Sequence, residues 1–323
     1  MHVGRSYRVV EFAMWSRRSV VYMVLLSLLA IGLFMLPPLK GFALPWQVVV
    51  MLGTTVSLVA GFKNSQVLGR SAEGLQTFAQ IAATSRMLAG FCRDFCEPQV
   101  ARILVHRHIA WLTALRFSLR RPMPWESMGR RANVEFRRRY HILEDTTTIG
   151  AEFERLAPEA TVLSAGLRPD LDLLSRQAEA FNTLFKTGDL PPQIYVELTK
   201  LLRDCHDQQA RCDRIKNSPY PRQYAIVSAM LVWCFCTFLP FGVVALFSQM
   251  GIGIWLAVPF STLIGWMYMA LDQVGESTSN PFEGNANDVP ISQICRDLEI
   301  ELRTALGESE VPRPLPAVNG IAT

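Results

Sequence analysis

Residues 46–62 read WQVVVMLGTTVSLVAGF, a run of 17 residues without a charged side chain. This is the short end of the roughly 17–25 residues that a helix needs to cross a hydrocarbon core about 30 Å thick. Residues 20–36 (VVYMVLLSLLAIGLFML) form a second uncharged run, and the Pro- and Gly-containing segment between the two predicts a turn. We therefore expect an antiparallel pair of membrane-spanning helices.

A second pair of uncharged runs lies near the other end of the chain. Residues 225–247 and 252–271 carry no formal charge, and only Ser248–Gly251 separates them. The chain is 50% apolar with a mean hydropathy of +0.19, more than one water-soluble core requires. The polar middle is typical of amphipathic helices, as in residues 102–120, where Ile103, His106 and Ala110 recur at helical spacing. The sequence thus predicts an all-α protein with four transmembrane helices and a large helical polar domain.

These patterns divide the chain into six segments. They are a cytosolic N-terminal segment (1–19), a transmembrane hairpin (20–62, with spans 20–36 and 46–62), a helical cytosolic domain (63–224), a second hairpin (225–271, with spans 225–247 and 252–271), a cytosolic C-terminal helical segment (272–311) and a disordered tail (312–323).

Positive charge predicts the orientation in the membrane. Arg5, Arg8, Arg17 and Arg18 precede the first span, whereas the first hairpin turn carries only Lys40. Because Lys and Arg favour the cytosolic side, both ends of a chain with four spans are expected in the cytosol, with the protein in the plasma (inner) membrane. A cleaved signal peptide is the rival interpretation of residues 1–40, but the apolar run is long and no small-residue cleavage site follows it.

The sequence contains no pattern typical of an enzyme or a metal site. There is no Gly-rich phosphate loop, no nucleophile elbow and no recognised metal-ligand spacing among its His and Cys residues. We expect no catalytic residue, no bound metal, no cofactor and reduced cysteines. The arginine runs at 130–131 and 137–139 are diluted by glutamates, so we expect anionic lipid or solvent at that surface and no nucleic acid.

The second span contains a stripe that permits two interpretations. Thr54, Leu58 and Phe62 recur every four residues and so share one face of the helix. This stripe could form an ordinary contact between helices. Alternatively, several copies of the chain could turn it inward to build a hydrophobic constriction in a channel.

A set of motifs in chain order resembles the bestrophin family of channels. Gly61-Phe62-Lys63-Asn64-Ser65-Gln66, followed by Arg70 and Glu73, is similar to its Gly-Phe-Arg-x-Asn stretch and the segment after it. Further similar motifs are His108-Ile109-Ala110-Trp111-Leu112, Cys212-Asp213-Arg214-Ile215 leading to Pro219-Tyr220-Pro221, Leu239-Pro240-Phe241, Asn280-Pro281-Phe282, Asn287-Asp288-Val289-Pro290 and Cys295-Arg296. Together they cover nearly the whole chain.

The resemblance implies a homopentamer around one central pore, with the lipid bilayer and inorganic ions as its other partners. By position, Thr54, Leu58 and Phe62 would line a narrow neck in the membrane. Gln193, or Ile194 if the register shifts by one residue, would form a second aperture in the cytosol, where relatives often have isoleucine. The remaining family-motif residues would be structural: Gly61, Asn64, Arg70, Glu73, Pro219, Pro221, Pro240, Pro281, Phe282, Asn287 and Asp288.

The departures from the family pattern also carry predictions. Ser71-Ala72 stand where the family usually has paired tryptophans, and Leu75 stands where it has a basic residue. Thr54 and Gln193 would make the two constrictions more polar than usual, which predicts a leakier pore. The stretch Glu276-Ser277-Thr278-Ser279-Asn280 lacks the carboxylate cluster on which the calcium clasp of animal members depends, so we expect no calcium gating.

The sequence therefore predicts an ion channel for monovalent ions. Chloride is the favoured ion, because no acidic ring occurs in the neck and residues 63–222 carry 24 Lys and Arg against 18 Asp and Glu. A sodium-selective channel of the same fold and a non-conducting membrane scaffold or signalling protein remain the alternatives.

Overall fold

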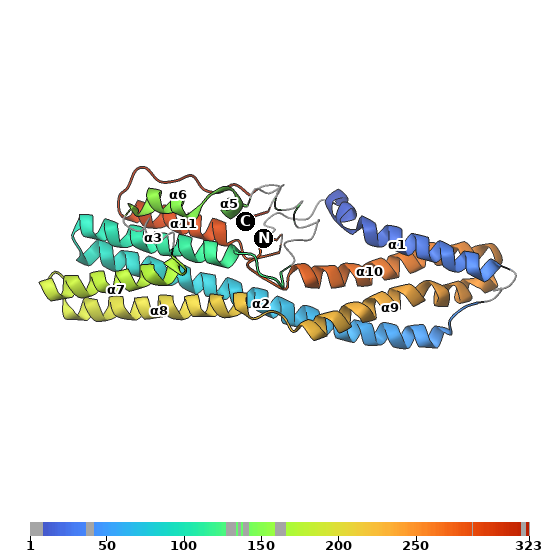
Figure 1. The fold of residues 1–323 in the computed structure, drawn as a ribbon. Coiled ribbons are helices and arrows are strands. Elements are labelled where there is room, and N and C mark those ends of the chain that lie inside the picture. The colour runs from blue at the N-terminus through green and yellow to red at the C-terminus, as the bar shows by residue number, and fades with distance from the viewer. Residues whose placement is uncertain are drawn as a thin grey trace. The chain divides into compact units, whose positions relative to one another are not determined.

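The chain is built from helices joined by short connections. A computed structural model describes residues 9–36, 42–126, 134, 137, 142–158, 166–285, 287–317 and 321–322. Its helices are α1 (Val9–Met35), α2 (Trp46–Phe95), α3 (Pro98–Arg120), α5 (Leu143–Thr146), α6 (Ile149–Leu156), α7 (Pro169–Thr187), α8 (Pro192–Asn217), α9 (Arg222–Phe247), the 3₁₀ segment η3 (Ser248–Leu256), α10 (Ala257–Ser277) and α11 (Ile291–Ala305) (Figure 1). No β-strand occurs within these ranges, and the all-α prediction is confirmed.

The helices group into two units, and α2 runs without interruption from one into the other. Of the described residues, those within 9–69 and 220–279 form the first, which we call the apolar unit, and those within 70–219 and 280–322 form the second, the polar unit. Arg5, Arg8, Lys40, the arginines at 130–131 and 138–139, and residues 318–320 and 323 of the predicted tail lie outside the described residues. Residues 312–317 of that tail carry no helix.

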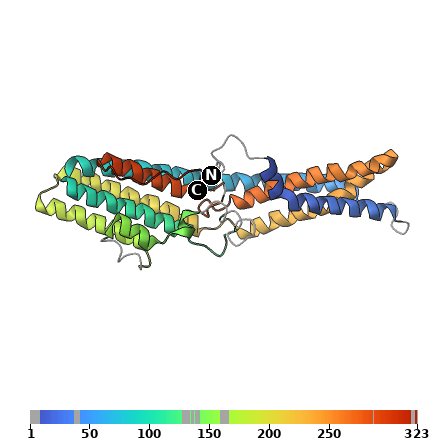
Figure 2. The ribbon, with the colours of Figure 1, turned by 90° about the horizontal axis from the view of Figure 1, so that it is seen from above.

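The apolar unit contains the membrane-spanning segments. Within the described residues, three helical stretches are long and apolar enough to cross a membrane, namely Met14–Met35, Trp46–Phe95 and Arg222–Ser277. The third consists of α9 and α10, which fold back on each other and pack with α1 (Figure 2). The prediction of four transmembrane helices is confirmed.

The connection between α9 and α10 differs from the sequence expectation. The predicted span 252–271 begins inside η3, and α10 starts only at Ala257. Gly251 has a φ of +60°, a left-handed conformation that few residues other than glycine adopt, and it interrupts the helical path. The turn is therefore about five residues longer than the uncharged runs suggested.

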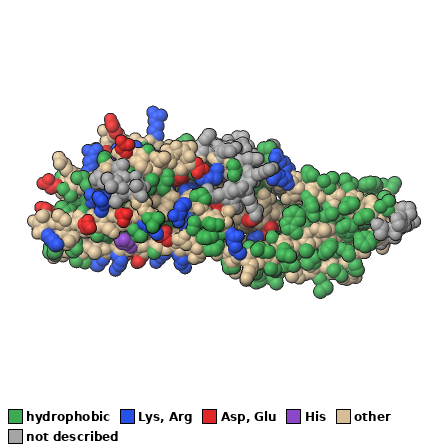
Figure 3. Space-filling model, viewed as in Figure 1, with side chains coloured by type: hydrophobic (Ala, Val, Ile, Leu, Met, Phe, Trp, Pro, Cys, Tyr) green, Lys and Arg blue, Asp and Glu red, His purple; other side chains and the backbone are tan. Residues whose placement is uncertain are grey.

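The surface of the apolar unit is suited to lipid. Large hydrophobic side chains are exposed around it, among them Leu25, Met51, Met230 and Ile252, and in Figure 3 hydrophobic side chains cover most of its visible face. Charged side chains gather instead on the polar unit. A continuous exposed apolar surface of this kind is expected of a protein solvated by hydrocarbon and not by water.

Glycines let the membrane helices pack closely. A Cβ atom on Gly53 of α2 would lie 2.9 Å from the ring of Phe235 on α9, and one on Gly242 of α9 would lie 2.7 Å from Val49. In the same way, the Met23 side chain of α1 occupies the space that a Cβ atom on Gly265 of α10 would need. In hydrocarbon, moving bulky apolar side chains from lipid into a helix contact gains little free energy. Small residues at the contacts instead allow the close packing that holds such helices together.

In the polar unit, α3 is surrounded by α6, α7, α8 and α11. Every residue from His108 to Arg116 is buried, so no single stripe of this helix faces the core. Of the residues that recur at helical spacing, Ala110 is buried, whereas the Ile103 side chain is half exposed.

Candidate functional site: the open face of helix α2

Helix α2 has two distinct faces in the apolar unit. Its buried side chains recur at alternating three- and four-residue intervals: Val49, Gly53, Val56, Ala60, Lys63 and Val67. Thr54, Leu58 and Phe62 lie on the opposite face, with Leu58 62% and Phe62 56% exposed. The shared face predicted for these three residues is confirmed. The Thr54 hydroxyl donates a hydrogen bond to the Met51 carbonyl at 2.9 Å, which leaves the methyl group and the oxygen lone pairs available on this face.

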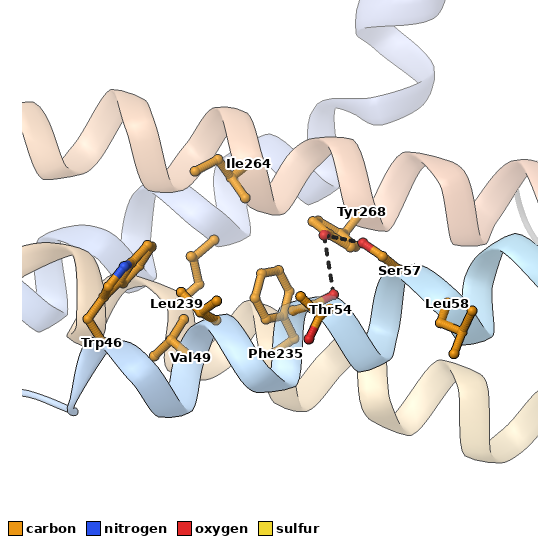
Figure 4. Close-up of a pocket in the computed structure, with 11 residues that line it drawn as sticks. Trp46, Val49, Thr54, Ser57, Leu58, Phe235, Leu239, Ile264 and Tyr268 are labelled. Carbon is orange, nitrogen blue, oxygen red and sulfur yellow. Dashed lines mark hydrogen bonds between the residues drawn. The ribbon is translucent and has the colours of Figure 1, made fainter.

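Contacts with α9 and α10 fix the rotation of α2 about its own axis. The hydroxyl groups of Ser57 and Tyr268 are hydrogen-bonded at 2.6 Å, and the Tyr268 hydroxyl also donates to the Gly53 carbonyl at 3.4 Å (Figure 4). The Phe235 ring lies against the same glycine. These contacts bury Gly53 against α9, and Leu58 and Phe62 lie on the far side of the helix.

An open groove of about 590 Å³ follows this contact region. It is lined by Trp46, Val49, Val50, Gly53, Thr54, Ser57, Leu58, Phe235, Leu239, Ile264 and Tyr268. Two residues of the predicted neck, Thr54 and Leu58, therefore form one wall of the groove, while Phe62 lies beyond it.

A buried ion pair stands directly after the stripe. The Lys63 ammonium donates to the Asp272 carboxylate at 2.6 Å, and both side chains are largely buried. At the next residue, the Asn64 amide nitrogen approaches the Leu271 carbonyl at 3.5 Å. Gly275 leaves no room for a Cβ atom because the Asn64 side-chain oxygen occupies that space. Lys63 and Asn64 of α2 thus contact α10 at the end of the stripe.

The sequence missed this pair, although a signal for it was present. Lys63 and Asp272 each stand one residue beyond an uncharged run, 46–62 and 252–271. Spans that end at the same depth in an antiparallel bundle bring such flanking charges together. The pairing of opposite charges at two span ends could therefore have been inferred from the sequence.

The start of α8 distinguishes the two candidates for the second aperture. Gln193 is exposed in the first turn of α8, whereas Ile194 is partly buried against the core of the polar unit. Of the two, only Gln193 has a side chain free to face an opening.

The first family-motif residues beyond the stripe have structural contacts. Arg70 donates to the Ile215 carbonyl at 3.1 Å, and Glu73 forms an ion pair with Arg214. Both contacts connect α2 to the end of α8 within the polar unit. Gly61, by contrast, has open space where a side chain would be.

The motif prolines mark the ends and the interior of helices. Pro219 and Pro221 lie between Asn217, where α8 ends, and Arg222, where α9 begins. Pro240 is buried inside α9, where it removes one backbone hydrogen bond of the helix.

The segment that follows α10 is held by arginine side chains. Arg120 donates to the Phe282 carbonyl at 3.2 Å, and Arg137 donates to the Glu283 carbonyl. Phe282 is buried against Phe78, with ring centroids 5.8 Å apart, and the Pro281 carbonyl accepts from the Val289 amide at 3.0 Å. These contacts bind the segment to α2, α3 and Arg137 within the polar unit.

Asp288 is buried within this segment and bonds to its backbone. Its Oδ2 atom accepts from the backbone amides of Gly284 and Asn285, at 2.7 and 2.8 Å, while its Oδ1 atom has no hydrogen-bond partner among the described residues. Burial raises the pKa of the Asp288 carboxyl to about 7, against the lowering effect of the Asn285 amide. Asn287, the preceding motif residue, is exposed.

No group of three or more His, Cys, Asp or Glu side chains able to hold a metal ion occurs in the described part of the chain. His108 is fully buried, and its Nε2 atom is hydrogen-bonded to the Ser85 hydroxyl at 2.9 Å. Burial lowers the pKa of this imidazole to about 3, so it is a neutral part of the polar unit's core.

The fold and the site define a class of protein: an all-α polytopic membrane protein whose second span presents an open stripe. Within that class the chain belongs to the bestrophins, since the model of the bacterial and fungal bestrophin family matches residues 12–304.

Individual relatives agree with this assignment. The voltage-dependent anion channel-forming protein YneE of Salmonella typhi is 26% identical over 264 residues, which cover 81% of this chain and 77% of that protein. A voltage-dependent anion channel-forming protein of Mesorhizobium japonicum is 25% identical over 268 residues, covering 83% and 77%. The crystal structure of a bacterial bestrophin homologue from Klebsiella pneumoniae superimposes with a TM-score of 0.77 at 22% identity, over 90% of this chain and 98% of that one.

Proposed function

We propose that this protein is an ion channel that passes monovalent ions, chloride in preference to sodium or potassium, and that it is not an enzyme. The curated relatives are named as anion channel-forming proteins. The observation that carries the proposal is the orientation of α2, which turns Leu58 and Phe62 away from the contacts of their own subunit.

Five copies of the chain around one axis would bring five such stripes together. Thr54, Leu58 and Phe62 would then form the neck, and Gln193 would form the second aperture. The burial of Ile194 supports Gln193 over its neighbour at that position. Because bulky apolar side chains form a barrier that water leaves readily, the neck would govern conduction by wetting and dewetting.

The channel would lie in the cell (inner) membrane with both termini in the cytosol. Gating would need no cofactor and no calcium, because Arg120 and Arg137 already bind the carbonyl groups of the segment after α10. The guanidinium groups of Arg120 and Arg137 would thus replace a bound cation at these carbonyl groups.

Reversal potentials in planar bilayers test the proposal. Purified protein is measured under a KCl gradient as wild type, as Phe62→Ala and as the matched pair Leu58→Ala and Leu25→Ala. Leu25 on α1 is the control, since it is as exposed as Leu58, at 62%, but lies on another helix. We expect reversal near the chloride potential, altered conductance for Phe62→Ala and Leu58→Ala, and no change for Leu25→Ala.

Other outcomes identify the alternatives. Reversal near the potassium potential would indicate a cation channel of the same fold. Correctly assembled protein that passes no current would support a membrane scaffold, and a monomer in mild detergent would contradict the pentamer.

A further inference from the structure

The ion pair between Lys63 and Asp272 lies at the Phe62 end of the proposed neck. Thr54, Leu58 and Phe62 carry no formal charge, and Lys63 follows Phe62 directly. One residue along a helix corresponds to a rotation of about 100°, so the lysine side chain leaves the stripe and enters the contact with α10. Only 6% of the Lys63 side chain and 15% of the Asp272 side chain are exposed.

Asp272 holds this lysine away from the stripe by direct contact. The Lys63 Nζ atom lies 2.6 Å from the Asp272 Oδ1 atom. The stem of the lysine runs along α10, because a Cβ atom on Gly275 would lie 3.6 Å from the Lys63 Cε atom. The close approach of Asn64 to Gly275 keeps the two helix backbones together at this point.

An unpaired lysine here would behave differently. A buried ammonium without a partner is costly in a medium of low dielectric constant. The lysine stem is long and flexible, so its charged end can move toward water near the end of the neck. The shorter Asp272 side chain has no comparable freedom.

We propose that Asp272 sets the ion selectivity of the channel by neutralising Lys63 and withholding its charge from the neck. This inference rests on the proposed function, because it requires copies of α2 around a conducting pore. In such an assembly each subunit contributes one paired lysine. Loss of the carboxylate would convert these pairs into a ring of cations at the Phe62 end of the neck, which raises the local anion concentration.

A purely structural ion pair makes a different prediction. If the pair only fixes α2 to α10, its loss lowers thermal stability or assembly and leaves the ratio of chloride to potassium permeability unchanged. The permeability ratio is therefore the discriminating readout, because stability responds to both roles.

The experiment measures reversal potential under a KCl gradient for four forms of the full chain: wild type, Asp272→Asn, Asp272→Glu and the double variant Asp272→Asn/Lys63→Gln. Size-exclusion chromatography in detergent selects preparations with the same assembly as wild type. We expect Asp272→Asn to raise the chloride-to-potassium permeability ratio roughly 3- to 7-fold, as a local potential of about 0.5–1 kT would do, because it enriches chloride and depletes potassium by the same factor. Asp272→Glu keeps the carboxylate and the wild-type ratio, and the double variant returns to the wild-type ratio because the cation is gone.

The outcomes separate this inference from the proposed function. If the wild type conducts and Asp272→Asn has an unchanged ratio, or if the double variant keeps the raised ratio, the role of Asp272 in selectivity is refuted while the channel remains. If assembled wild type passes no current, both the channel and the inference are refuted. If Asp272→Asn does not assemble, two double variants replace it. Lys63→Arg/Asp272→Glu keeps both charges and Lys63→Gln/Asp272→Asn removes both, so each must have the wild-type permeability ratio. A changed ratio in either contradicts the proposal.

Discussion

The buried carboxyl group of Asp288 predicts an unusual dependence of stability on pH. The pKa of this group is about 7 in the folded chain, because burial disfavours its charged form, whereas its ordinary value is 3.8. The folded state therefore binds a proton more tightly than the unfolded state over this interval. The stability contributed by the protonated carboxyl is fully present below about pH 4, decreases as the pH rises toward 7 and is absent above it.

The size of the effect follows from the pKa difference. About three pKa units correspond to roughly 4 kcal/mol over the whole interval, of which roughly 2–3 kcal/mol fall between pH 5 and pH 8. Asp288→Asn removes the titration and keeps an oxygen that can accept from the Gly284 and Asn285 amides. Relative to wild type, this variant should gain roughly 5–10 °C in apparent Tm between pH 5 and pH 8.

The assay is tryptophan fluorescence during heating of the detergent-solubilised protein, at one fixed scan rate because such unfolding is often irreversible. Asp207→Asn is the matched control, since Asp207 is an exposed aspartate in the middle of α8. The control should follow the wild-type pH dependence. An Asp288→Asn protein that is less stable than wild type at pH 8, or whose Tm changes with pH as the wild type's does, would refute the reasoning.

Three further substitutions in the polar unit have expected outcomes by the same assay. Trp111→Phe removes the 2.8 Å bond from the indole nitrogen to Gln209 and should cost roughly 1–3 kcal/mol; a neutral result would mean that water replaces the indole. Lys216→Met leaves the buried Glu126 carboxylate without its ion-pair partner and should cost roughly 3–5 kcal/mol, most of which the double variant Lys216→Met/Glu126→Leu regains; equal losses in both would contradict this. Gly188→Ala places a side chain at a φ of +84° and should cost about 1–2 kcal/mol, whereas no loss would show that the end of α7 rearranges easily.

The spans and most helices could be predicted from the sequence because their signals are local. An uncharged run of about 20 residues needs no partner to be recognised. The runs 46–62 and 225–247 lie inside helices, and so does the run 20–36 except for its last residue. The stripe of Thr54, Leu58 and Phe62 was also predictable, since four-residue spacing fixes a shared helix face. The assignment of the neck and aperture roles came from the family resemblance and not from this spacing.

Other features depend on contacts between segments far apart in the chain. The segment that contains Asp288 is bonded by Arg120 and Arg137 from elsewhere in the polar unit, and no pattern around residue 288 indicates this. The burial of every residue from His108 to Arg116 likewise depends on four neighbouring helices, so periodicity within α3 could not indicate it. Loss of the helix period in η3 depends on the backbone conformation of a single residue, Gly251.

The orientation of α2 follows from the solvent of the apolar unit. In water, the bulky Leu58 and Phe62 would be driven inward and the small Gly53 and Ser57 would face out. Hydrocarbon removes this preference, so Gly53 can be buried in close contact with Phe235 while Leu58 and Phe62 stay exposed. Bulky side chains then point outward both toward lipid, as Leu25 does, and toward the proposed pore, as Leu58 does. Leu25 and Leu58 are equally exposed. Any difference in conductance between Leu25→Ala and Leu58→Ala therefore reports the location of Leu58 on α2 and not its exposure.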